Sequence, residues 1–431
     1  MNDNDWISGT DTNSGIGSVS IFSSLLVLTI FATVASSSRI APTLLGQVVV
    51  VSLYGVLLLA TGYLHTGYRV PRMPLLVFLL IYGVFVVNLI RIYTGLLEFP
   101  GLILQSSASM YANIFVYTTA YIVGSATTIF VIPSWFDRNY VFSVVSIISA
   151  VTVLIGLLTY AVGDFNVGSI TIRNYTSIQP LRGWGISVPA MASYFQDANA
   201  MSKFALAGTF CSLYYYLGER SRLGAGLLVV NSLGLFLGNS RSALLGAMLG
   251  AMVFLTYVRL GRRSLRVFLL AGGSIAIPTA VVLVSPATES FFGISFSGRL
   301  FLWQKSLNAI AANPLLGAGI YEVGQTVNAY TALDIGGLAP QNSYLRVIVA
   351  TGILGGSSYI GLLCWATLKH VSTVRTARDA VTLALFVAFL VVHFTDTVDP
   401  FGMNKNSMVF GLALGYVLQD IYHLSGQQTD Q

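Results

Sequence analysis

Long apolar runs, separated by polar segments, make up most of the chain. A helix that crosses a bilayer needs about 20 predominantly apolar residues, whereas transmembrane strands would appear as alternating segments of about ten residues. The runs here are continuous, so they predict helices. Twelve runs are of this kind, at residues 18–35, 44–62, 75–90, 114–132, 141–162, 200–217, 223–237, 243–258, 267–284, 345–368, 381–394 and 407–421. The pattern predicts an all-α polytopic integral membrane protein, with residues 1–431 forming a single transmembrane domain of about 12 transmembrane helices.

The composition strengthens this prediction and excludes two other classes of protein. Hydrophobic residues make up 55% of the 431 residues and charged residues only 9%. A soluble protein carries roughly a quarter of its residues as charged side chains, so these few charges cannot cover a water-soluble domain. The high apolar content is also the opposite of the signature of a disordered chain.

The basic residues are unevenly distributed between the two sides of the membrane that these spans define. The loops after even-numbered spans are short and carry twelve of the 22 Lys and Arg residues. Short basic loops stay in the cytoplasm, so we expect both termini there. The net charge of +6 then reflects topology and does not indicate a nucleic-acid partner. The twelve residues are Arg69, Arg72, Arg138, Arg220, Arg222, Arg259, Arg262, Arg263, Arg266, Lys369, Arg375 and Arg378.

Two outward-facing connections, residues 163–199 and 285–344, are much longer than the others. Long loops are uncommon unless they are functional, so we expect the chemistry on the outer face. The first loop combines Gly and Pro with aromatic residues such as Trp184 and with the cations Arg173 and Arg182, which suits a groove for a sugar and a lipid head group. Simple anchoring of these residues at the membrane interface is the alternative.

The second long loop contains a segment with helical periodicity. Its apolar residues recur at Leu300, Trp303, Leu307 and Ile310, and Asn313-Pro314 provides a stop signal. We expect an amphipathic helix on the membrane surface. Arg299 lies in its first turn, where the helix dipole makes a cation mildly unfavourable. Either a structural salt bridge or an anion-binding role explains that placement.

A third candidate is the arginine in the tight turn between the seventh and eighth spans. Arg241 begins a span there, and charged residues within or beside the hydrocarbon are functional candidates. An interfacial arginine without a function is the alternative. Two GxxxG patterns follow in the chain, and we expect them to mark close helix packing. They are formed by Gly246 with Gly250 and by Gly352 with Gly356.

Four stretches, taken in order, resemble the O-antigen polymerase and ligase superfamily of membrane glycosyltransferases, the Wzy and WaaL families. They run from about residue 194 to residue 356, and their matching positions are Asp197-Ala198-Asn199; Arg241 and Leu245; Arg299, Trp303, Pro314, Gly317 and Gly319; and Asn342, Gly352 and Gly355. One position departs from the pattern, because the histidine of the ligase motif is Gln341 here.

The resemblance implies a metal-independent glycosyltransferase of the GT-C type that needs no cofactor. Such proteins transfer a glycan from a polyisoprenyl (undecaprenyl) diphosphate to an acceptor hydroxyl on the outer, periplasmic face of the inner membrane. A guanidinium group offers bidentate, charge-assisted hydrogen bonds to a diphosphate. Arg241 and Arg299 are therefore the expected catalytic arginines. The expected substrate-binding residues are Arg173, Arg182, Trp184, Asn199, Trp303, Asn342 and Arg346.

The general base, if one is needed, is not fixed by the sequence. The family motif favours the neighbourhood of Gln341, but a glutamine amide cannot take up a proton at neutral pH. The chemistry favours an acid of the external loops, with Glu322 as the first candidate and Asp334 and Asp197 as alternatives. His393, in the outer half of a span, is a further alternative, although a lone histidine there is more often structural.

The leading hypothesis is a polymerase that joins lipid-linked repeat units into O-antigen, capsule or exopolysaccharide, since the missing histidine disfavours the ligase mechanism. A ligase acting on lipid A, or an O-linked oligosaccharyltransferase acting on protein, is the first alternative. A transporter or flippase is the alternative from another class. The implied partners are the lipid-linked glycan donor and acceptor, membrane lipids, and a chain-length regulator or a flippase.

Overall fold

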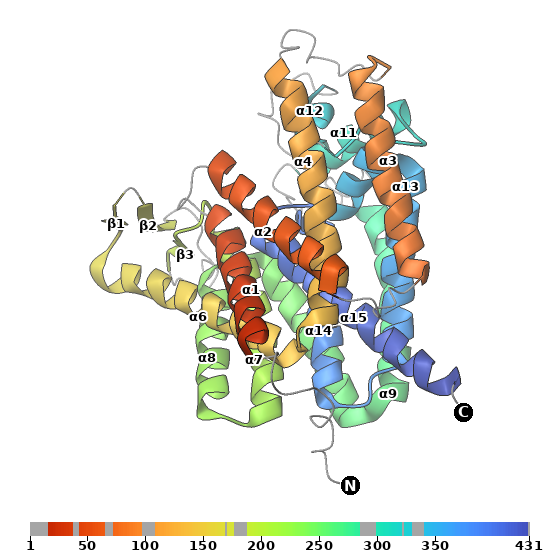
Figure 1. Ribbon diagram of the computed structural model, residues 1–431. Helices are drawn as coiled ribbons and strands as arrows, with labels where there is room; N and C mark the ends of the chain where they lie inside the picture. The colour runs from red at the N-terminus through yellow and green to blue at the C-terminus, as the bar shows by residue number, and fades with distance from the viewer. Residues whose placement is uncertain are drawn as a thin grey trace.

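The computed structural model is a bundle of helices with a small sheet beside it (Figure 1). The structure describes residues 16–37, 43–64, 72–96, 108–168, 170–175, 188–284, 299–320, 323–329 and 340–429. The helices of the first half are α1 (Ile16–Ser36), α2 (Thr43–Leu64), α3 (Arg72–Tyr93), α4 (Ala108–Ala126), the π-helix η1 (Thr127–Val131), α5 (Ile132–Trp135) and α6 (Arg138–Val162). The later helices are α7 (Ala198–Glu219), α8 (Arg222–Leu237), α9 (Arg241–Val284), α11 (Arg299–Ala312), α12 (Val323–Asn328), α13 (Ser343–Val371), α14 (Ala377–Thr395) and α15 (Lys405–Thr429).

The twelve apolar runs predict the positions of helices correctly, because each of them lies within a helix or within the continuous α4, η1 and α5 segment. The predicted number of spans is not confirmed. In the described residues, six helices are long and apolar enough to cross a membrane: Arg72–Tyr93, Tyr111–Trp135, Arg138–Val162, Arg241–Ser274, Ser343–Val371 and Ala377–Thr395. Three shorter apolar helices, Ile21–Ser36, Gly46–Ala60 and Arg222–Leu237, accompany them. The protein is therefore an integral membrane protein.

The first long loop contains a sheet that the all-α prediction does not include. Strands β1 (Phe165–Val167), β2 (Ile170–Tyr175) and β3 (Ala190–Ser193) pair antiparallel in that order. Ile170, Thr171 and Ile172 favour strand, because β-branched side chains fit a pleated surface. In Figure 1 the strands lie at one side of the bundle, next to the end of α6.

Side-chain caps define where several helices begin. The Asp197 carboxylate accepts a hydrogen bond from Ala200 N (2.7 Å) at the start of α7. Thr376 and Asp379 form a capping box at the start of α14. Such caps satisfy N–H groups that have no partner within the helix.

Helix α14 lies in the core and packs closely against α9. A Cβ added to Gly246 would lie 2.7 Å from the Ala388 carbonyl oxygen, and one added to Gly250 would lie 2.7 Å from that of Ala384. The expectation of close helix packing at this GxxxG pattern is confirmed. It brings the start of α9, with Arg241, close to the C-terminal half of α14.

Candidate functional site

The candidate site begins with a contact between the two ends of the second long connection. Arg299, the first residue of α11, donates from its Nε to Gln341 Oε1 at 2.9 Å. Gln341 precedes α13 and has a left-handed backbone with φ of 48°. The structure therefore brings together the predicted catalytic arginine and the residue at the family's histidine position. The two are 42 residues apart in the chain.

Trp303 holds α11 in this position. Its indole is completely buried, and its Nε1 donates to the Pro340 carbonyl at 2.9 Å. Its ring also contacts Phe394, at the end of α14, with a centroid separation of 5.3 Å. A helix lies where the sequence predicts one, and it ends directly before Asn313. Leu307 of the predicted apolar face is exposed, and the position of the helix on the membrane surface stays a prediction. Its buried face, which includes Leu300 and Trp303, packs against α13.

Asn342 and Ser343 connect the start of α13 to the end of α14. Asn342 caps α13 by accepting from Leu345 N (3.0 Å), and it donates to the Phe394 carbonyl (3.0 Å). Ser343 donates to the Asp396 carbonyl through both its backbone N (3.1 Å) and its Oγ (2.9 Å). The backbone on both sides of the site is thereby fixed.

Asp396 also belongs to an ion pair, with Lys203, that the sequence did not indicate as part of the site. Lys203 in α7 donates to the Asp396 carboxylate at 2.6 Å, and both side chains are largely buried. Lys405, at the start of α15, lies with its Nζ 3.6 Å from the centre of the Phe195 ring. Burial, together with the charge of Lys203, lowers the pKa of Lys405 from its usual value of 10.5 to about 7.

Arg241 is exposed at the start of α9, and its turn packs against the same part of α7. Ser240 N donates to Ser202 Oγ (3.4 Å), directly beside Lys203. A Cβ on Gly238 would lie 2.7 Å from the Ser202 Cβ. The turn before Arg241 therefore packs against the part of α7 that carries Lys203.

The glycines of the family motifs have a structural explanation. Gly352 breaks α13 with a φ of 65° and a ψ of −169°, and residues 314–319 insert at the break. There the carbonyls of Val349 and Ala350 accept from Ala318 N and Gly319 N (2.9 Å each), while Ile353 N donates to the Pro314 carbonyl (2.7 Å). A Cβ on Gly352 would lie 2.2 Å from the Leu315 carbonyl oxygen. Gly352 thus allows a loop to approach, which differs from the helix packing expected of its GxxxG pattern.

Helix α3 supports the inserted segment from the other side. Asn88 Nδ2 donates to the carbonyls of Leu316 (2.6 Å) and Ala350 (3.2 Å). Arg91 Nη1 donates to Asn88 Oδ1 (2.7 Å) and to the Gly317 carbonyl (3.1 Å). The position of α11, and with it that of Arg299, is therefore tied to α3, which is long and apolar enough to cross a membrane.

Arg346 lies in the interior and does not face the Arg299 contact. Its Nη1 donates to both carboxylate oxygens of Asp399, at 2.6 and 2.7 Å, and to the Phe401 carbonyl at 3.3 Å. The Asp399 side chain has no solvent exposure. The guanidinium thus has an internal anionic partner.

The remaining candidates are distributed more widely. Arg173 lies on β2 opposite Ser193, half-buried, and Asn199 lies half-buried in the first turn of α7. Both nitrogens of His393 are engaged within the core, by the Tyr359 hydroxyl (2.9 Å) and the Phe389 carbonyl (2.7 Å). The candidates Arg182, Trp184, Glu322 and Asp334 lie outside the described residues. Within the described part of the chain, no group of three or more His, Cys, Asp or Glu residues could hold a metal ion.

Helix α11, Gln341 and the break at Gly352 all lie within a segment of the chain that matches a known family. Residues 226–360 match the O-antigen ligase family. The resemblance to the O-antigen polymerase and ligase superfamily is confirmed. This family indicates a glycosyl-transfer enzyme whose substrates are a polyisoprenyl-linked glycan and a lipid.

Other comparisons add little to the family match. A solved structure described as "Structural coordination of polymerization and crosslinking by a peptidoglycan synthase complex" aligns with 80% of this chain and 97% of its own chain. The sequence identity is 15% and the TM-score is 0.36. No curated protein matches the sequence.

Proposed function

We propose that this protein polymerises polyisoprenyl diphosphate-linked oligosaccharide repeat units on the outer face of the inner membrane. The observation that carries the proposal is the hydrogen bond from Arg299 to Gln341. It joins a guanidinium, a group suited to binding anions, to an amide at the position where the ligase motif has a proton-accepting histidine. Both termini lie in the cytoplasm in this proposal.

The donor diphosphate binds between Arg299 and Arg241. Because Arg299 uses its Nε for Gln341, its planar edge formed by Nη1 and Nη2 is directed elsewhere and suits two parallel bonds to phosphate oxygens. Arg241, exposed at the start of α9, supplies a second cation. Two cations stabilise the charge that develops on the leaving diphosphate.

In the reaction, the hydroxyl oxygen of the acceptor sugar attacks the anomeric carbon of the donor glycan. The bond between that carbon and the diphosphate oxygen breaks, and polyisoprenyl diphosphate leaves with the electron pair. The hydroxyl proton passes to a base, for which Glu322 remains the first candidate. Among the described alternatives, Asp197 is exposed and His393 is enclosed in the core, so Asp197 is the more accessible of these two.

The other candidate residues position the glycans or the site. Arg173, Arg182, Trp184 and Asn199 belong to the first long loop, where they suit contacts with sugars and the head group. Trp303 and Asn342 act through the backbone that they fix, since they donate to the carbonyls of Pro340 and Phe394. Arg346 acts through its ion pair with the Asp399 carboxylate.

The deciding experiment incubates the purified protein with a polyisoprenyl diphosphate-linked repeat unit and separates the products by length. A ladder of products supports the polymerase. A single transfer to added lipid A or to a protein acceptor would instead support the ligase or oligosaccharyltransferase alternative. Transport of the lipid-linked glycan in proteoliposomes without any glycan product would support the flippase alternative.

Variants test the arginine clamp in the same assay. Arg299→Ala and Arg241→Ala should each lower the rate about a hundredfold, as expected for the loss of one group that stabilises an oxyanion. Lys305→Ala is the matched control, because Lys305 lies on α11 beside the Phe301 ring. Normal chain growth by both arginine variants would contradict the proposal.

A further inference from the structure

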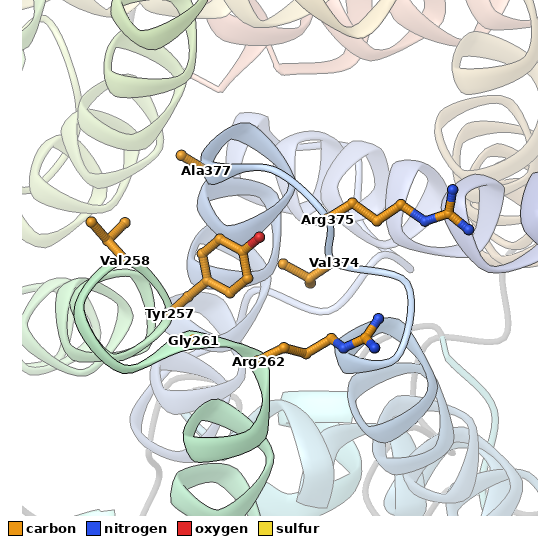
Figure 2. Close-up of a pocket in the computed structure, with 7 residues that line it drawn as sticks. All are labelled: Tyr257, Val258, Gly261, Arg262, Val374, Arg375 and Ala377. Carbon is orange, nitrogen blue, oxygen red and sulfur yellow. The ribbon is translucent and has the colours of Figure 1, made fainter.

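A cavity of about 610 Å³ lies between the turn in α9 and the loop that joins α13 to α14. Figure 2 shows the α9 ribbon changing direction at Gly261, which has a non-helical φ of 77° and ψ of −179°. The cavity is lined by Tyr257, Val258, Gly261, Arg262, Val374, Arg375 and Ala377. Its size is within the range of small-molecule binding sites in proteins.

The cavity is strongly basic. Residues 257–266 and 369–378 contain seven Lys and Arg residues and no acid. Two of them, Arg262 and Arg375, line the cavity, and Figure 2 shows their guanidinium groups on either side of the loop at Val374. Two acids adjoin these residues, and both have partners. The Asp379 carboxylate accepts from the backbone N of Arg375 (3.0 Å) and Thr376 (2.9 Å), and Asp420 pairs with His370 and Arg138. An anion in the cavity would therefore meet a net positive charge.

The position of the cavity relative to the membrane follows from helix lengths. From Arg241 to the break at Gly261 there are 20 residues, or about 30 Å at 1.5 Å per residue, which equals the thickness of the hydrocarbon core. Helix α14, with 19 residues, covers a similar length from Ala377 in the cavity to Thr395 beside Asp396. The cavity and the candidate site therefore lie at opposite membrane boundaries.

The surface beside the cavity is apolar. Leu255, Val258 and Leu260 on the same end of α9 are all exposed, between 48% and 67%. A soluble anion would not use such a surface, whereas acyl chains would cover it. Basic pockets between transmembrane helices at a membrane boundary are suited to anionic lipid head groups.

We infer that this cavity binds the phosphodiester head group of an anionic phospholipid, with Arg262 and Arg375 holding the phosphate. Tyr257 lies between α9 and Val374 in Figure 2 and offers its hydroxyl to the head group. The acyl chains lie along the exposed apolar side chains of α9. This inference does not depend on the proposed glycosyl transfer.

The test measures lipid binding to the purified full-length protein by native mass spectrometry. Phosphatidylglycerol is titrated against phosphatidylcholine with the same acyl chains. The Arg262→Gln/Arg375→Gln variant should bind phosphatidylglycerol about tenfold more weakly, corresponding to the loss of charge-assisted hydrogen bonds. Arg259→Gln/Arg266→Gln removes the same charge from the same turn outside the cavity, and should change the affinity less than twofold.

Arg262 also donates to the Ser372 carbonyl (3.1 Å), so its replacement can loosen the loop. The single variant Arg375→Gln keeps that bond and should still lower the affinity severalfold. Equal weakening in the cavity pair and the control pair would overturn the inference in favour of general charge attraction. Equal affinity for phosphatidylcholine would also overturn it. Displacement of phosphatidylglycerol by inorganic phosphate alone would identify a free-phosphate site instead of a lipid site.

Discussion

Arg299 Nε and Gln341 Oε1 are 2.9 Å apart, and this bond joins the first residue of α11 to the residue that precedes the Asn342 cap of α13. A neutral amide orients the guanidinium without neutralising its charge. A carboxylate at the same position would orient it equally well and cancel the charge that a diphosphate needs. In the proposed diphosphate site, the amide of Gln341 therefore leaves the charge of Arg299 available to the phosphate.

The first prediction concerns that amide. Gln341→Glu should raise the KM for the lipid-linked donor about tenfold. The new carboxylate would form a salt bridge with Arg299 and compete with the phosphate, and the loss of a charge-assisted hydrogen bond of roughly 1.5 kcal/mol corresponds to that factor. Gln341→His keeps a neutral acceptor, and histidine tolerates the left-handed backbone better than most residues. It should retain the KM within about twofold. The kinetics of polymer formation give both values, and the same KM for both variants would contradict the prediction.

The second prediction separates structure from binding at Arg346. Arg346→Met leaves the buried Asp399 carboxylate without its cation, which should destabilise the protein by about 3 to 5 kcal/mol. The double variant Arg346→Met/Asp399→Leu should regain most of that loss in a thermal unfolding assay in detergent. It should also regain activity in proportion to the folded fraction. A stable but inactive double variant would show that Arg346 binds substrate directly.

The third prediction concerns the break in α13. Gly352→Ala places a Cβ 2.2 Å from the Leu315 carbonyl oxygen at a φ of 65°, so it should destabilise the protein by at least about 1 to 3 kcal/mol. Gly361→Ala, on the same helix with no atom within 4 Å of the added Cβ, should be neutral or stabilising by about 0.5 to 1 kcal/mol. Thermal midpoints measure the contrast. Equal midpoints would mean that the inserted segment yields to the methyl group.

The fourth prediction is a pH dependence caused by Lys405. Its pKa of about 7 in the folded protein is below the usual 10.5. Between these values the unfolded chain holds a proton that the folded protein has released, so stability rises with pH across this window. Below about pH 7 Lys405 is protonated in both the folded and the unfolded state, so burial of its charge lowers the stability of the folded protein by the full amount. Wild-type stability relative to Lys405→Met should therefore increase from pH 7 to pH 10. Parallel curves for the two proteins would contradict the assignment.

The sequence predicts the helices well because apolar runs determine them locally. It fails where distant segments exchange hydrogen bonds. At the break in α13, backbone groups of residues 314–319 form the hydrogen bonds that the helix would otherwise form with its own backbone. No local pattern in the sequence predicts this exchange. The glycines at 317, 319 and 352 were visible as a motif, but only the structure explains why a side chain cannot fit at Gly352.

The candidate site was predicted in part. The order of motifs identified Arg299, Trp303 and Gln341, and the structure places them together. Lys203 and Asp396 were missed as a pair because 193 residues separate them. A signal was present, since Lys203 is the one basic residue in the run 200–217, and a charge in such surroundings requires a partner.

The inserted segment also sets a condition on how the protein is assembled. Without residues 314–319, the Val349 carbonyl would lose the bond from Ala318 N, and the Ala350 carbonyl would keep only the bond from Asn88 Nδ2. A carbonyl without a partner has a large free-energy cost in hydrocarbon. Residues 314–319 precede α13 and so leave the ribosome first. We therefore expect residues 314–319 to take their place against α13 as that helix enters the bilayer.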